Sequence, residues 1–360
     1  MLEPRGAVDG PLPGGEALLE RAAGALRDAQ DVDGDVRDGS SSGRACSPVG
    51  TSVAQPPAVR LGGSLEMCRP TTRVTLDAMS AQPDVDDLQA CDPGLYGPDS
   101  VTWRVHADPS MALAGLRALL LQAVHPLAMS GVAQHSDFRD DPWGRLFRTA
   151  EYVGVTTYGT TVQAQRAGAK VRGIHRRLAG IEPESGRAYR VDDPALLRWV
   201  HCVEVESFLT TALRCGLRLT DAEQDRYYAE QVVGASLVGL DPATVPASVG
   251  QMAAYFREVQ PDLRVTAKAR EAARFILWPP MPSLVGLGTP ARPAWVALTT
   301  AAFAMLPRWA RRLYSLPGLP TTDLAATAAG LAFRTGLLVV PDALRAGPHL
   351  KDARARTGTG

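Results

Sequence analysis

The sequence predicts an all-α fold, in which a single multi-helix globular domain spans residues 96–340 after a disordered N-terminal region, residues 1–95. Two observations carry this prediction. Apolar residues recur at helical spacing in many segments, and hardly any run of strand length alternates between apolar and polar residues. With 45% hydrophobic residues, the chain can also form a sizeable core. The last residues, 341–360, are expected to form a flexible tail.

The first 95 residues are rich in Gly, Pro, Ser and Asp, and residues 31–44 read DVDGDVRDGSSSGR. Such a composition cannot bury enough apolar surface to offset the entropy lost on ordering, so we expect disorder. Residues 15–29 are an exception, with apolar residues near helical spacing at Leu18, Leu19, Ala22 and Leu26. They predict a docking helix, with a marginal helix or a start codon placed too early as the alternatives.

The ordered part begins near Trp103, and its first long element is the apolar run 111–132, which Pro126 interrupts. Proline has no N–H and its ring collides with the preceding turn. We therefore expect a kink there and a carbonyl without its donor about four residues earlier. Further helices are predicted at 145–153, 161–179, 194–215, 221–238, 246–260, 265–278, 293–306 and 322–336, and a strand at 188–191.

The overall charge and the cysteines limit the classes of protein to which the chain can belong. The 38 basic and 38 acidic residues cancel, which argues against nucleic acid as the partner. The five cysteines are scattered and form no C-x-x-C motif, so we expect reduced thiols in a cytoplasmic protein. The first residues do not combine a basic stretch with an apolar run, and a secretory signal is not expected. The oligomeric state is not indicated.

The longest apolar stretches, 111–132 and 289–306, are interrupted by polar or charged side chains. A membrane-spanning helix needs about 20 consecutive apolar residues, so both stretches are expected to be buried helices. The second stretch and the residues just after it also contain aromatic and basic side chains, for which peripheral contact with a bilayer surface is an alternative. They are Trp295, Phe303, Trp309 and the run 308–312.

Histidines are the first candidates for chemistry, because a packed helical domain can bury a porphyrin with an imidazole as iron ligand. The helical region contains His125, His135, His175 and His201. His175 lies at the edge of a predicted buried stripe, and His201 in a strongly apolar helix. His125 either binds iron or caps the carbonyl that Pro126 frees. A core or surface histidine without a ligand is the alternative at each position.

Arg145, Arg148 and Thr149 occupy positions i, i+3 and i+4 of a predicted helix, so they share one face. Two guanidinium groups and a hydroxyl there suit a site that holds haem propionates or polarises bound dioxygen. A solvated basic stripe is the alternative for an isolated R-x-x-R-T motif.

Other chemistries find less support in the sequence. It contains no G-x-G-x-x-G motif after a strand, no phosphate-binding loop, no H-E-x-x-H and no G-x-S-x-G. A di-iron helical bundle needs Glu-x-x-His pairs on facing helices. Glu204 and Glu206 follow His201 at the wrong spacing for such a pair, which disfavours a di-iron site.

Seven blocks between residues 103 and 201 carry a resemblance. They are 115–126 (GLRALLLQAVHP), 134–138 (QHSDF), 141–149 (DPWGRLFRT), 158–160 (YGT), 174–175 (IH), 180–189 (GIEPESGRAY) and 193–201 (DPALLRWVH). In these blocks the sequence resembles the catalytic domain of the rubber oxygenase (latex clearing protein)/MpaB family, formerly a domain of unknown function. Beyond about residue 205 only the helical character agrees.

The resemblance implies a helical fold that holds haem b through an axial histidine, and an oxygenase that cleaves carbon–carbon double bonds of isoprenoid chains. Rubber-cleaving members carry R-x-x-K-T on the distal side of the haem. Arg145 and Thr149 match that motif and are implied as catalytic residues, with Arg148 in the place of the lysine. Unlike lysine, arginine does not deprotonate. The axial iron ligand is implied to be His175, with His201 as the rival.

The expected function is therefore a haem-dependent oxygenase or oxidoreductase that acts with dioxygen on a hydrophobic, unsaturated small molecule. The residues expected to bind the cofactor are His175, His125, His201 and Arg145, with His175 on the metal. Two alternatives remain open. One is a helical ligand- or partner-binding protein of the same fold without catalysis, and the other is a haem-dependent oxidase or dehydrogenase without oxygen insertion.

Overall fold

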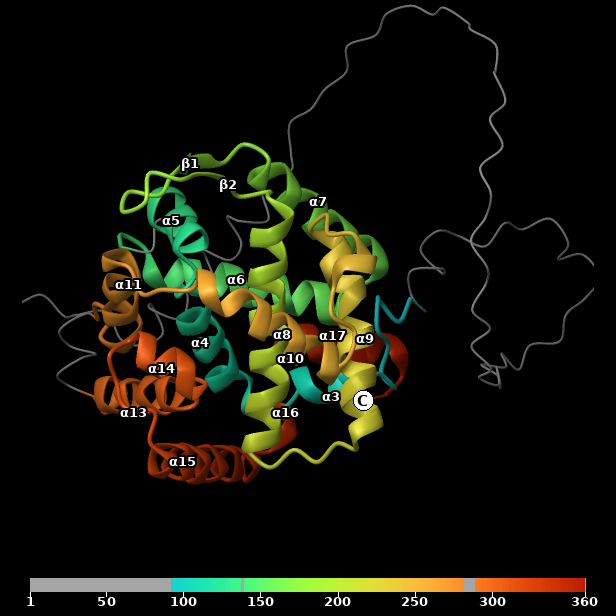
Figure 1. The fold of residues 1–360 in the computed structure, drawn as a ribbon. Coiled ribbons are helices and arrows are strands. Elements are labelled where there is room, and N and C mark those ends of the chain that lie inside the picture. Colours follow the sequence, from blue (N-terminus) through green and yellow to red (C-terminus); the bar gives the residue numbers. More distant parts are fainter. Residues whose placement is uncertain (1–91, 137–138, 282–288, 360) are drawn as a thin grey trace, which may run out of the picture. The chain divides into compact units, whose positions relative to one another are not determined.

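The computed structural model of the chain describes residues 92–136, 139–281 and 289–359. In this part of the chain, fourteen α-helices and two short 3-10 helices accompany a single two-stranded sheet (Figure 1), so the predicted all-α fold is confirmed. The helix expected at 15–29 lies outside the described residues. Residues 92–95, expected to be disordered, instead belong to the domain, because the Asp92 carboxylate accepts hydrogen bonds from the backbone N–H and the hydroxyl of Thr161.

The helices follow the predicted segments, with ends that differ by a few residues. The first elements are α3 (Val101–His106), α4 (Met111–Gln122), α5 (Pro126–His135), α6 (Pro142–Tyr158), α7 (Thr161–His175), β1 (Ala179–Ile181) and β2 (Ala188–Arg190). They are followed by α8 (Pro194–Arg214), α9 (Asp221–Leu237), η2 (Pro242–Thr244), α10 (Val249–Val259), η3 (Gln260–Asp262) and α11 (Ala267–Leu277). The last are α13 (Ala291–Ala304), α14 (Arg308–Leu313), α15 (Pro320–Leu338), α16 (Asp342–Arg345) and α17 (Pro348–Thr357).

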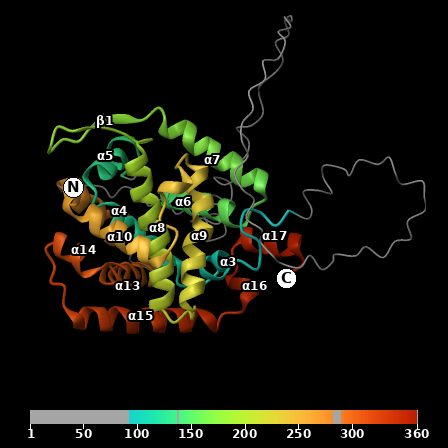
Figure 2. The same ribbon diagram turned by 45° about the vertical axis from the view of Figure 1, so that its right-hand side comes forward.

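Helix α8 runs from the β1–β2 hairpin at one end to α15 at the other (Figures 1 and 2). It begins as the sequence predicts, because the Asp193 carboxylate accepts from the backbone N–H of Ala195 and Pro194 occupies the first turn. Helix α4 packs along α8. The core between them includes the buried side chains Leu120, Leu121, Val124, Trp199 and Val203.

A buried guanidinium joins α4 to α8 and to the end of α13. Arg117 is 1% exposed, and its Nη1 and Nη2 donate to the two carboxylate oxygens of Glu206, at 2.7 and 3.1 Å. It also donates to the Ser207 hydroxyl and, from Nε, to the carbonyl of Met305. Arg117 interrupts the apolar run of α4, but a carboxylate compensates its charge and each nitrogen has an acceptor.

The predicted kink at Pro126 is a full break, with α4 and α5 bent by 105°. The carbonyl of Gln122, which would have accepted from an N–H at position 126, accepts from the indole Nε1 of Trp199 at 3.1 Å. The same carbonyl accepts from the backbone N–H of His125 at 3.3 Å, but not from the imidazole. His125 is the N-cap of α5, and its Nδ1 accepts from the backbone N–H of Ala128 at 3.4 Å. The indole of α8 and the main chain of His125 therefore share the carbonyl that the proline frees.

Helices α6 and α7 pack on each other, and α7 leads into the hairpin. Thr160 and Gln163 form a capping box at the start of α7. The helix ends at His175, four residues before the predicted end, because Ala179–Ile181 pairs as strand β1 with Ala188–Arg190 in antiparallel register. Gly180 lies opposite Tyr189 in this register. His175 is thus the last residue of a helix rather than an interior one.

The segment after residue 340 is not the flexible tail that the sequence predicts. Its two helices, α16 and α17, end the described chain, and Leu350 and Ala353 of α17 are buried against the domain. Arg356 donates to the carbonyls of Asp92 and Tyr158. The sequence did not indicate these contacts, because α17 is polar overall and packs against the domain with only one of its faces.

None of the described helices alone has the length and apolar composition to span a membrane, although α4 and α5, bent by 105°, meet these criteria as a pair. The aromatic residues considered for a bilayer surface are half-buried and contact other parts of the domain. Trp295 donates to the carbonyl of Ile276, Phe303 packs on Tyr314 and Trp309 on Phe256. These contacts account for the buried part of each ring, and peripheral membrane contact stays a prediction.

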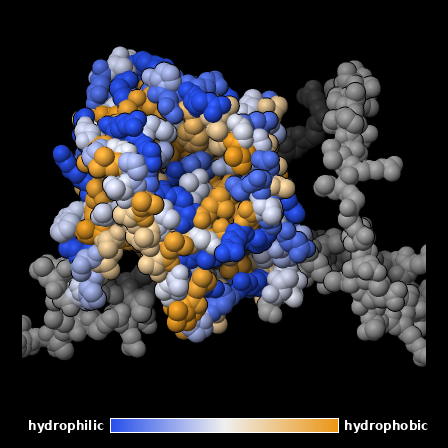
Figure 3. Space-filling model, turned by 60° about the horizontal axis from the view of Figure 1, so that its bottom comes forward, coloured by the Kyte–Doolittle hydropathy of each residue, from blue (hydrophilic) through white to orange (hydrophobic). Residues whose placement is uncertain are grey.

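The exposed apolar side chains near the C-terminal helices lie elsewhere. Leu324 is 72% exposed, and Leu331 and Leu338 follow it at intervals of seven residues on the outer side of α15. Figure 3, which views the domain from the side of α15, shows hydrophobic residues interspersed with hydrophilic ones on this face. Further exposed apolar residues of this region lie just before and after the helix, at Leu316, Leu319, Val339, Val340 and Leu344.

Replacing Trp199 tests the hydrogen bond at the break between α4 and α5. In Trp199→Phe, the Gln122 carbonyl loses its indole donor and keeps only the longer bond from the backbone N–H of His125, and one hydrogen bond contributes about 1 kcal/mol. We expect the free energy of unfolding, measured by urea denaturation, to fall by about 1 kcal/mol more than in Trp309→Phe. Trp309 packs against the same core, so an equal loss in both variants would contradict this role.

Candidate active site in a helical cavity

A cavity of about 550 Å³ lies between α8 on one side and α6 and α7 on the other. Residues of α4, α5, α9, α11 and α13 complete its wall, which is mainly apolar. Ligand sites in proteins typically measure about 300–1,000 Å³ and combine hydrophobic walls with a few polar groups. This cavity is therefore the candidate site.

Two tryptophans form part of the wall between α6 and α13. The rings of Trp143 and Trp295 meet edge to face, with centroids 4.7 Å apart. The indole N–H of Trp143 donates to the carbonyl of Pro280, after α11, at 3.1 Å. The indole N–H of Trp295 donates to the carbonyl of Ile276, near the end of α11, at 2.9 Å. Both rings are thus fixed in orientation and present their carbon atoms to the cavity.

Four of the six histidines have hydrogen-bond partners that give them structural roles. The pairs are His106 with Thr157 and Tyr227, His125 with the N–H of Ala128, His135 with the carbonyl of Ala179, and His349 with Glu151. His125 is also not among the residues that line the cavity. The prediction that His125 binds a cofactor is therefore replaced by its observed role as the N-cap of α5.

His175 and His201 differ from the other histidines. Each has a buried ring nitrogen without a hydrogen-bond partner among the described residues, Nδ1 in His175 and Nε2 in His201, and both side chains line the cavity. Burial lowers the pKa of both imidazoles, to about 4 for His201, while the carboxylate of Asp192 partly opposes this effect at His175. Both are neutral near neutral pH, the form in which an imidazole binds a metal.

The three residues of the R-x-x-R-T motif all line the cavity from α6, as their spacing predicts. Arg145 donates from Nε to the Ser136 hydroxyl at 2.8 Å, and no carboxylate pairs with it among the described residues. Burial and the charge of Arg148 lower the pKa of Arg145. Arg148 is exposed and pairs with Asp141 at 3.0 Å, and Thr149 donates to the carbonyl of Arg145. Arg145 is therefore the member of the motif with a free guanidinium edge in the cavity.

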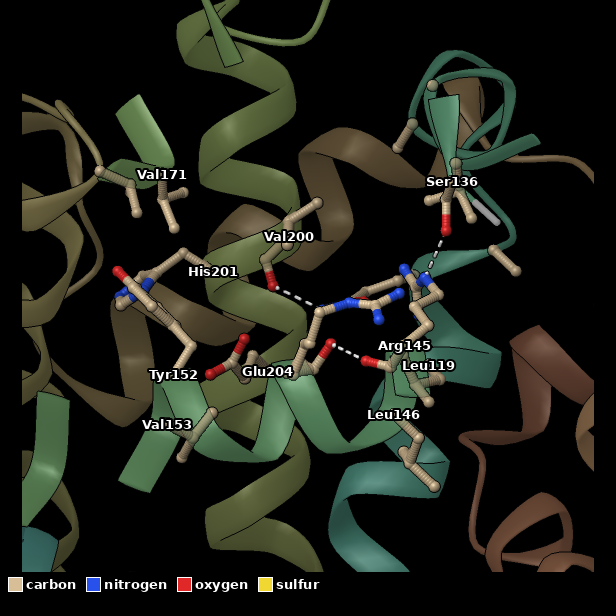
Figure 4. A pocket seen from close by; sticks show the side chains of 18 of the residues that line it. Leu119, Ser136, Arg145, Leu146, Tyr152, Val153, Val171, Val200, His201 and Glu204 are labelled. Atoms are coloured by element: carbon tan, nitrogen blue, oxygen red, sulfur yellow. Dashed lines mark hydrogen bonds between the residues drawn. The ribbon is translucent and has the colours of Figure 1, made fainter. Parts of the chain in front are cut away.

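Glu204, one turn after His201 on α8, is a site residue that the sequence analysis missed. Figure 4 shows His201 and Glu204 projecting from α8 into the cavity, with Tyr152 of α6 on the same side and Arg145 on the other. Burial raises the pKa of Glu204 to about 7, and the carboxylate has no hydrogen bond or ion pair within the described part of the chain. Its signal was present in the sequence as an acidic residue inside an apolar helix.

Tyr96 is a second missed residue, because it precedes the region of resemblance. It lines the cavity, and its hydroxyl approaches the backbone of α9 so closely that a Cβ at position 234 would lie 2.7 Å from it. Gly234 thus makes room for the phenol. Burial raises the pKa of Tyr96, and the nearby phenol of Tyr152 and carboxylate of Glu204 add to this effect.

The family profile described as "ER-bound oxygenase mpaB/B'/Rubber oxygenase, catalytic domain" matches residues 103–337 of the chain. The chain belongs to this family. The match runs from α3 to the end of α15 and includes the R-x-x-R-T motif, both unpartnered histidines and Glu204. Comparisons with curated proteins and with solved structures give no match.

Membership of the mpaB/rubber oxygenase family identifies the domain as an oxygenase catalytic domain. Within the described residues, no three His, Cys, Asp or Glu side chains are grouped so that they could hold a metal ion. A haem iron takes its other ligands from the porphyrin and needs only one axial side chain. Among the described residues of the cavity wall, His175 and His201 each have a buried ring nitrogen without a partner.

The raised pKa of Glu204 predicts a pH-dependent stability. The folded protein holds the proton of the Glu204 carboxyl more tightly than the unfolded chain does. Protonation of Glu204 therefore stabilises the fold fully below about pH 4.5, and this contribution is lost as the pH rises through about 7. Relative to Glu204→Gln, the free energy of unfolding of the wild type should fall by up to about 3 kcal/mol between pH 5 and pH 8, measured by urea denaturation. A pH-independent difference would contradict the assignment, and the exposed Glu258→Gln serves as the control.

Proposed function

We propose that this chain is a haem b-dependent oxygenase that uses dioxygen to oxidise a hydrophobic, unsaturated small molecule. The observation that carries the proposal is the buried, unpartnered Nδ1 of His175 in the wall of a cavity that also contains the unpaired edge of Arg145. Membership of an oxygenase family supports the reaction class. The apolar wall supports a hydrophobic substrate.

The residues of the cavity fit a haem group. The volume of about 550 Å³ lies within the range of ligand sites, and the wall supplies a neutral imidazole with a nitrogen available for iron. His175 would be the axial ligand, since it follows the R-x-x-R-T motif most closely in the sequence. Arg145 would hold a carboxylate such as a haem propionate, because a guanidinium group binds a carboxylate through two parallel hydrogen bonds and Arg148 is already paired with Asp141.

The side chains of this chain would position the reactants and exclude water. When bound, haem supplies the one-electron and dioxygen chemistry that amino-acid side chains lack. Ser136 accepts from Nε of Arg145 and so orients its guanidinium, which can donate to an oxygen atom in the cavity. Thr149 donates to the Arg145 carbonyl and supports the same turn of α6. The fixed rings of Trp143 and Trp295 keep their side of the cavity apolar.

Haem binding by variants of the full chain tests this assignment. His175→Ala removes the proposed iron ligand, so we expect its haem occupancy to drop at least about tenfold, measured from the Soret band of protein expressed with added iron and haem precursor. His201→Ala should retain the band. His125→Asn, which can still cap α5, is the matched control for loss of a histidine.

Full haem occupancy in His175→Ala, or its loss in His201→Ala alone, would transfer the role to His201. A colourless wild-type protein under these conditions would overturn the oxygenase in favour of a ligand-binding protein. Oxygen consumption with an unsaturated lipid, followed by product analysis, separates oxygen insertion from dehydrogenation.

A further inference from the structure

The cavity has a second polar region, distinct from the R-x-x-R-T motif, formed by His201 and Glu204 of α8 and Tyr152 of α6. Figure 4 shows this region on the opposite side of the cavity from Arg145 and Ser136. Figure 4 shows Val200 between the two regions, and Leu119, Leu146 and Val153 are further apolar residues of the wall. The cavity therefore combines two separate polar regions with a largely apolar wall.

The two glutamates of α8 show that the second region is unusual. Glu206 is fully engaged, since it accepts from both terminal nitrogens of Arg117 and from the Thr210 hydroxyl. Glu204, two residues earlier, is half-buried in the cavity wall and has no such partner among the described residues, and the Nε2 of His201 is buried without a partner. A buried polar nitrogen without a partner is costly to the fold and rare. Such an imidazole, next to a carboxylate in a cavity wall, indicates a partner supplied by the ligand.

We propose that His201 and Glu204 form a subsite for a hydroxyl group of the substrate, so that the substrate is an apolar molecule with an alcohol or phenol at one end. This inference rests on the proposed function only in taking the cavity as the substrate site. A hydroxyl donates one hydrogen bond and accepts others. It can donate to the Glu204 carboxylate while it accepts from His201 or from the phenol of Tyr152.

Other ligand groups fit this region less well. A hydrocarbon end would leave the carboxylate and the imidazole nitrogen unsatisfied. A carboxylate or phosphate end would meet the negative charge of ionised Glu204. An ammonium group could pair with Glu204, but burial of its charge in a largely apolar cavity is costly. A neutral hydroxyl offers both a donor and an acceptor without adding a charge.

Calorimetric titration of the purified full chain with two matched ligands tests the subsite. Farnesol carries a hydroxyl on an unsaturated chain, and its deoxy analogue carries hydrogen in that position. We expect the wild type to bind farnesol at least about tenfold more tightly, because the analogue leaves buried polar groups unpaired. In Glu204→Leu, which keeps the approximate size of the side chain, the ratio of the two dissociation constants should fall to about one.

The surface variant Glu258→Leu is the matched control, and it should keep the wild-type ratio because Glu258 is exposed and not part of the cavity wall. Glu204→Gln, closest to the native shape, provides the second test if Glu204→Leu fails to fold. A neutral acceptor makes roughly half as strong a bond, so its ratio should be at least about threefold below that of the wild type. Equal binding of both ligands by the wild type, or an unchanged ratio in the Glu204 variants, would overturn the proposal.

The outcome is separable from that of the oxygenase proposal. A haem-free protein that still prefers farnesol through Glu204 would keep the subsite and refute the oxygenase. A haem-bound protein without this preference would refute the subsite and keep the oxygenase.

Discussion

The buried ion pair between Arg117 and Glu206 is the constraint on which the rest of the domain depends. It fixes the rotation of α8 against α4, because a fully buried guanidinium must keep its carboxylate or bear an uncompensated charge. The carbonyl of Met305, at the end of α13, accepts from the same arginine. One side chain thus sets the positions of three helices that contribute to the cavity wall.

With its rotation fixed, α8 packs into the core with one face and lines the cavity with another. Trp199 and Val203 enter the core, and the Trp199 indole also satisfies the carbonyl that Pro126 leaves open. Val200, His201 and Glu204 line the cavity. The spacing of 3.6 residues per turn explains this division, since residues 200, 201 and 204 share a face that residues 199 and 203 only border. A rotation of α8 would therefore disturb the core and the site together.

The sequence predicts the helices well because their signals are local. Asp193-Pro194 starts α8 as expected, and the proline inside the run 111–132 marks a real break. The side-chain roles depend on which elements meet, and here prediction was weaker. Whether His125 binds iron or completes a hydrogen bond could not be decided without knowing that Trp199 reaches Gln122. Glu204 was considered only against a di-iron spacing, since its lack of a partner is a property of the folded chain.

The contact of Arg356 with the carbonyl of Asp92 brings the start and the last helix of the described domain next to each other. A domain whose first and last segments meet in this way can be closed by a short linker and reopened elsewhere, because the order of connection matters less than the contacts between helices. The exposed turn around η2 offers one such opening. The described domain can therefore be circularly permuted at this turn, and the new ends would not interrupt α4 or α8.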